Sequence, residues 1–155
     1  MTHDNILAGP VLLLRGSLGE RWRLSALFLL AGEAEPDDLS VEGVSLKVPP
    51  RHVAGWRDLH VWRFDFAVTP GDEDLSVPYG FADMPPRWRF TLPAGGRPRR
   101  VGFVAGAGVR DADGEAGVWA SIADDHARRP LHLLLGGGGQ VDGSAAWRDC
   151  PTLAG

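Results

Sequence analysis

The sequence predicts a mainly β protein in which an antiparallel β-sandwich precedes a single βαβ unit. From residue 10 to about 98, short apolar runs alternate with turns rich in glycine, proline and acidic residues, as is typical of antiparallel strands. After residue 99 the pattern changes to an apolar run, a segment of helical periodicity and a second apolar run, which is the order of a βαβ unit. We therefore expect two domains, at 8–98 and 99–155.

The first two strands are expected to form a hairpin. The runs 11–16 and 22–30 are separated by the turn-like residues 17–20. Alternation in the second run places five side chains on one face of the strand: Trp22, Leu24, Ala26, Phe28 and Leu30.

The remaining strands of the sandwich are expected at 41–50, 61–69 and 87–93. In the second of these runs, four side chains face one way and two the other: Trp62, Phe64, Phe66 and Val68 against Arg63 and Asp65. The third run repeats the pattern with Trp88, Phe90 and Leu92. This spacing favours a sandwich of the immunoglobulin or fibronectin type with its aromatic residues in the core. The alternative is a row of exposed aromatics that binds carbohydrate or peptide.

The βαβ unit is expected to begin with a strand at 101–109 that is covered on both faces, because its apolar run does not alternate. A helix then brings together Val118, Trp119, Ile122, Ala123 and His126, and Pro130 ends it. A second buried strand follows at 131–135. Two parallel strands and one helix cannot cover their own apolar faces. We expect a second copy, a partner chain, the sandwich or missing sequence to cover them.

Composition excludes several function classes. The 155 residues carry a net charge of -4, which argues against a general nucleic-acid binder. We interpret the one basic cluster, Arg97, Arg99 and Arg100, as a solvated linker. The N-terminus lacks a secretion signal and no apolar run reaches about 18 residues, so we expect no membrane span. One cysteine, Cys150, indicates an ordinary thiol in a cytoplasmic protein.

Common catalytic and binding motifs fail on specific residues. The glycine run 136–139 lacks the lysine and hydroxyl of a phosphate-binding P-loop, and Val141 stands where a dinucleotide fingerprint needs glycine. Residues 111–115 open like a calcium loop, but Ala116 and Ile122 replace its glycine and glutamate, so a helix cap is expected. Five histidines lie apart without metal-ligand spacing: His3, His52, His60, His126 and His132. We therefore assign no catalytic, cofactor-binding or metal-binding residue.

The segment 119–153 resembles the first metal-binding region of the PhoD-like (alkaline phosphatase D) metallophosphatases. In that family a helix with tryptophan precedes a strand ending in a GGDQ-type turn, followed by tyrosine, an acidic stretch and tryptophan; Trp119 and Trp147 match the two tryptophans. The upstream runs resemble the family's N-terminal sandwich and first catalytic strand. The resemblance implies metal-dependent phosphate ester hydrolysis with divalent or trivalent ions.

The chain departs from this family at its metal ligands. The family's metal-binding aspartate aligns with Gly139, its tyrosine with Asp142 and the next acidic residue with Ser144. Its Cys-Asn pair aligns with Gly106 and Ala107, and segments resembling the later GNH and GHxH ligands are absent. We therefore expect a truncated or degenerate homologue that is inactive alone and needs no cofactor. The alternative is a non-catalytic sandwich that serves as a binding module.

Overall fold

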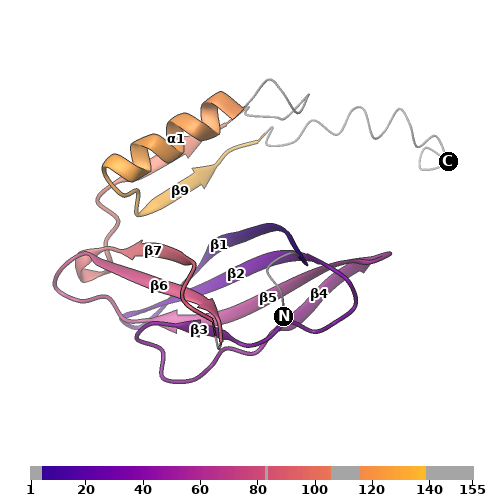
Figure 1. Ribbon diagram of the computed structural model, residues 1–155. Helices are drawn as coiled ribbons and strands as arrows, with labels where there is room; N and C mark the ends of the chain where they lie inside the picture. The colour runs from indigo at the N-terminus through magenta and orange to yellow at the C-terminus, as the bar shows by residue number, and fades with distance from the viewer. Residues whose placement is uncertain (1–4, 83, 106–115, 139–155) are drawn as a thin grey trace. The chain divides into compact units, whose positions relative to one another are not determined.

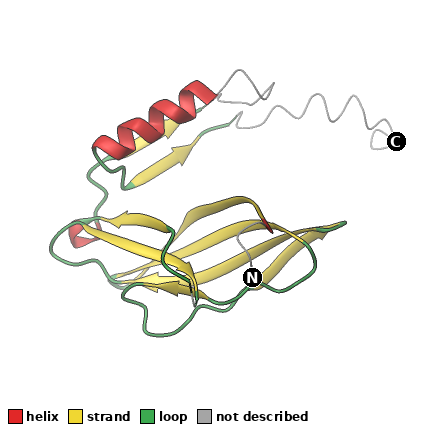
Figure 2. Ribbon diagram, viewed as in Figure 1, coloured by secondary structure: helices red, strands yellow, loops and turns green. Residues whose placement is uncertain are grey.

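The computed structural model describes residues 5–82, 84–105 and 116–138. The chain divides into two compact units, Met1–Arg97 and Pro98–Gly155, one residue from the boundary expected at 98. Strands dominate the first unit, and one α-helix appears among the described residues, in the second unit (Figure 2). The predicted mainly β composition is thus correct. No helix in this part of the chain is long and apolar enough to cross a membrane.

The first unit contains two antiparallel sheets (Figure 1). The four-stranded sheet has the order β1-β2-β5-β4, with β1 at Ile6–Leu18, β2 at Arg21–Ala31, β4 at Arg51–Trp56 and β5 at Leu59–Val68. The three-stranded sheet has the order β3-β6-β7, with β3 at Leu39–Val41, β6 at Leu75–Phe81 and β7 at Trp88–Leu92. The predicted hairpin of the first two strands is confirmed by the register of β1 on β2.

One apolar core lies between the two sheets. The alternating residues of β2 and β5 that the sequence assigns to one face are all buried, from Trp22 to Leu30 and from Trp62 to Val68. The ring of Phe28 on β2 lies 5.2 Å from the rings of Phe81 on β6 and Trp88 on β7. Burying side chains of this size contributes roughly 2 kcal/mol each. The aromatic rows therefore form the core, as predicted. They do not form an exposed platform for carbohydrate.

The prediction of a strand at 41–50 is wrong, because β3 ends at Val41 and Val48 makes only an isolated bridge to Leu39. Strands β4 and β6 were not predicted. A proline inside β6, Pro78, makes this segment look unlike a strand in the sequence. Strand β3 ends beside Pro78, and the carbonyl oxygen of Pro78 accepts a hydrogen bond from the N–H of Glu42. The missing N–H of Pro78 therefore leaves no strand partner unsatisfied.

The second unit contains β8 (Val101–Val104), α1 (Ala116–Arg128) and β9 (Leu133–Gly136), with β8 and β9 paired in parallel. In the single chain neither strand is covered on both faces by the described residues, as expected of two strands and one helix that cannot cover their own apolar surface. Phe103 is 70% exposed and Leu135 46% exposed. Val104 is the one buried residue among those described after residue 97. A single helix beside two short strands removes too little apolar surface from water to form a core.

Candidate functional site

The candidate ligand site of the second unit is the edge where β8 and β9 end. Because the strands run in the same direction, their carboxyl ends meet there (Figure 1). Val104 lies opposite Gly136, and the N–H of Gly137 donates a 2.6 Å hydrogen bond to the carbonyl oxygen of Val104. Ligands of open parallel sheets bind beyond this edge.

Close approach of β8 leaves no room for a side chain at Gly137, whereas Gly138 is open. A Cβ atom added at Gly137 would lie 2.8 Å from the Cβ of Ala105 and 3.0 Å from the Cζ of Phe103. Only glycine fits such an approach without displacement of the neighbouring strand. The described residues that follow the strands, Ala105, Gly137 and Gly138, therefore offer backbone groups and no carboxylate, imidazole or thiolate.

The dinuclear metal centre implied by the resemblance has no ligand cluster among the described residues. Such a centre requires several carboxylate, imidazole or thiolate ligands close together. In the described ranges no three His, Cys, Asp or Glu side chains gather closely enough to hold an ion. The aligned positions Gly106, Ala107, Gly139, Asp142 and Ser144, the proposed cap at 111–115 and Cys150 lie outside the described residues.

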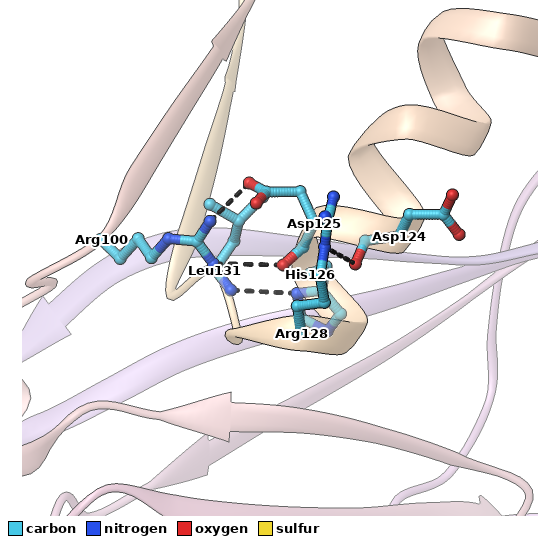
Figure 3. A network of polar contacts seen from close by, with 6 residues as sticks. All are labelled: Arg100, Asp124, Asp125, His126, Arg128 and Leu131. Atoms are coloured by element: carbon cyan, nitrogen blue, oxygen red, sulfur yellow. Dashed lines mark hydrogen bonds and ion pairs between the residues drawn. The ribbon is translucent and has the colours of Figure 1, made fainter.

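A polar network lies at the opposite end of the second unit, where α1 ends and β9 has not begun (Figure 3). The Arg100 guanidinium donates to the backbone carbonyl of Asp125 at 3.3 Å and forms an ion pair with the Asp125 carboxylate. The Asp125 carbonyl also accepts from the N–H of Arg129 at 3.0 Å, and a cation beside the last turn of a helix interacts favourably with the negative end of the helix dipole. Arg100 thus belongs to a C-terminal cap of α1, and the prediction of a wholly solvated linker is wrong for this residue.

Two histidines accept hydrogen bonds at the same junction, one in the predicted helix and one in the predicted second strand of the βαβ unit. The Nδ1 atom of His126 accepts from the N–H of Leu131 at 3.0 Å. The Nδ1 atom of His132 accepts from the N–H groups of Arg99 at 3.1 Å and Arg100 at 3.3 Å. A nitrogen that accepts these bonds carries no proton. Both imidazoles therefore hold the chain in place and leave only Nε2 for other partners.

The structure brings together two histidines that the sequence analysis left apart. The Nε2 atom of His52 on β4 lies 3.0 Å from the Nδ1 atom of His60 on β5, and the His52 ring packs 5.0 Å from Trp62. The Nε2 atom of His60 is buried and has no partner among the described residues. The two histidines lie eight residues apart in the sequence, and the β4–β5 hairpin, which the sequence did not predict, brings them into contact. Two imidazoles bonded to each other do not make a metal site.

A charged cluster occupies the outer face of the four-stranded sheet. Asp65 accepts hydrogen bonds from Ser25 at 2.5 Å and from the Nε of Arg63 at 3.1 Å, and Arg51 lies 3.6 Å away. Burial raises the pKa of Asp65, but the Ser25 hydroxyl and the two guanidinium groups together lower it below its ordinary value. Asp65 is therefore a charged structural group and not a proton donor.

Comparisons with known proteins identify no relative. No family model, curated protein or solved structure matches this chain.

Proposed function

We propose that this chain is a non-catalytic relative of the PhoD-like metallophosphatases. In this proposal, the first unit corresponds to the family's immunoglobulin- or fibronectin-like sandwich, and the second to the first strand-helix-strand unit of its catalytic domain. The order of the elements supports the proposal, as does the glycine turn directly after β9. No cofactor is expected for the chain alone.

The observation that carries the proposed loss of catalysis is the set of residues at the aligned ligand positions, Gly106, Ala107 and Gly139. The parent reaction requires a metal-activated water and Lewis-acid stabilisation of the phosphoryl oxygens. Side-chain ligands must hold the ions for either effect. Gly137 has no room for one, although Gly138 beside it is open, and none of the three aligned residues has a ligating side chain.

The test is an assay of the purified full chain on an aryl phosphate and a phosphodiester, with Mn, Fe, Ca or Zn supplied. We expect no metal-dependent turnover and no metal retained after equilibrium dialysis. Turnover with any of these ions would contradict the proposal. If that turnover survived in Asp142→Ala, the ligands would lie elsewhere and the alignment with the family would be wrong.

A second candidate function is that of a non-catalytic binding module whose second unit docks onto another chain. The observation that favours it is the exposure of Val101, Phe103 and Leu135 on short strands that share almost no core. Exposed apolar groups of this size gathered in one small unit mark an interaction surface.

Sedimentation velocity of the full chain and of Phe103→Lys tests the binding-module function. A binding module predicts self-association or partner capture that the charge at Phe103 abolishes. A monomer with the sedimentation coefficient of Phe103→Lys over the whole concentration range would exclude self-association through this surface. Phosphatase activity is measured separately, so the two proposals fail independently.

A further inference from the structure

Strand β1 forms an open edge of the four-stranded sheet (Figure 1). Among the described residues it pairs with β2 alone, so one side of its backbone has no strand partner. Arg15 is the only charged residue in its 13 positions, and the side chains of Leu7, Val11, Leu13, Leu14 and Leu18 are exposed. Long apolar edges of this kind pair readily with another strand.

The other edge of the sheet is different. Strand β4 has six residues, begins with Arg51 and contains a register shift between His52 and Ala54. Short length, charge and bulges are the devices that prevent edge strands from pairing. Strand β1 carries some of the same devices outside Val11–Leu14, namely Pro10 and register shifts, so its open part is this stretch.

Regular pairing in β1 is confined to Val11–Leu14. Register shifts lie on both sides of it, between Ala8 and Val11 and between Leu14 and Ser17. Within the regular stretch, Val11 and Leu13 lie opposite Leu27 and Ser25 on the outer face. Leu12 and Leu14 lie opposite Ala26 and Leu24 on the inner face, where Leu12 packs against the core. A strand added to this edge must therefore present apolar side chains on both of its faces.

We propose that β1 of a second copy of this chain pairs with this edge, antiparallel, about a two-fold axis perpendicular to the sheet. The segment Val11–Leu14 is itself apolar on both faces, so the same segment of a second copy presents the side chains that this edge requires. A two-fold axis in this direction keeps inner faces on one side of the joined sheet, so inner residues must lie opposite inner residues. Leu12 then lies opposite Leu12 of the other copy, or Leu13 opposite Leu13.

Cysteine crosslinking tests this geometry in the full chain with Cys150→Ser as background. Residues directly opposite across antiparallel strands have Cβ atoms about 4.5 to 5.5 Å apart, close to the separation of about 3.5 to 4.5 Å that a disulfide requires. We expect Leu12→Cys or Leu13→Cys to give a covalent dimer on mild oxidation. Leu46→Cys, at a loop residue that is 79% exposed, serves as the control and should remain monomeric. Failure of both β1 variants to crosslink above this control would overturn the proposal.

Charge substitution tests the same edge without a disulfide. The full chain should show a concentration-dependent dimer by sedimentation equilibrium. Leu13→Lys should weaken it at least tenfold by placing two like charges close together across the axis. Circular dichroism verifies that the variant is folded, and Leu46→Lys should dimerise as the parent chain does. A parent chain that stays monomeric at high micromolar concentration would refute the proposal, as would a dimer lost in Phe103→Lys but retained in Leu13→Lys.

Discussion

The hydroxyl of Ser25 on β2 donates a 2.5 Å hydrogen bond to the Oδ1 atom of Asp65 on β5. Ser25 is fully buried although it lies on the outer face of the sheet, and it stands directly opposite Asp65 in the register. Arg63 and Arg51 hold the same carboxylate from its other oxygen. The outer face thus contains a polar cluster joining three adjacent strands.

Ser25→Ala should lower the free energy of unfolding by about 1 to 2 kcal/mol, because it removes a hydrogen bond to a charged acceptor. Urea denaturation measures the change. Ser40→Ala is the matched control, since Ser40 lies on an exposed position of β3 and its loss should cost less than about 0.5 kcal/mol. Equal denaturation midpoints for the two variants would show that the Ser25 bond contributes nothing net.

Acid should remove the contribution of Asp65 to stability. The folded pKa of this carboxyl lies below its unfolded value, so its stabilising effect is complete above the unfolded value of about 4. As the pH falls, the unfolded chain takes up this proton at a higher pH than the folded chain does. The stabilisation therefore decreases from the unfolded pKa down to the folded pKa, and none of it remains below the folded pKa. The difference in unfolding free energy between the parent chain and Asp65→Asn should therefore shrink as the pH drops from neutrality below 4. A difference that is constant or grows with acid would contradict this assignment.

The bulged end of β1 depends on glycine at residue 9. Gly9 has a φ of +104°, and an added Cβ would lie 2.6 Å from the carbonyl oxygen of Leu27. Gly9→Ala should cost more than the roughly 1 to 2 kcal/mol expected for left-handed backbone strain alone. Gly19→Ala isolates that strain, since Gly19 has a φ of +59° with no atom near an added Cβ. Thermal unfolding of the two variants should rank Gly9→Ala as the less stable; the reverse order would show that β1 moves away from Leu27 without cost.

Hydrophobic periodicity predicts the strands in which one whole face is apolar and packs into the core. The alternation of Trp22 to Leu30 and of Trp62 to Val68 identifies β2 and β5, because one face of each strand fills the core. Strand β6 contains Pro78 and Gly80, which ordinarily interrupt strands. An added Cβ at Gly80 would lie 3.2 Å from the Cα of Pro86, a close contact between segments that periodicity does not register.

The candidate sites show the same limit. The hydrogen bond between His52 and His60 depends on a hairpin whose first strand, β4, is exposed throughout and has no apolar alternation. Likewise, Arg100 looks like one member of a solvated basic cluster until α1 brings Asp125 beside it. Contacts between polar groups follow from the placement of the elements, and the residues themselves carry no local signal of the pairing.

The Arg100 cap predicts how the second unit responds to a single substitution (Figure 3). Arg100→Ala removes the side-chain donor to the Asp125 carbonyl and the ion pair with its carboxylate and leaves only the bond from the Arg129 N–H, so the last turn of α1 should fray. Amide hydrogen exchange in α1 should accelerate about threefold to tenfold, corresponding to roughly 0.7 to 1.4 kcal/mol for a partly exposed cap. Arg99→Ala is the matched control, because Arg99 contacts His132 through its backbone N–H and that bond survives the substitution. Similar exchange in both variants would mean that the general positive charge of the segment, and not the geometry of Arg100, stabilises the end of the helix.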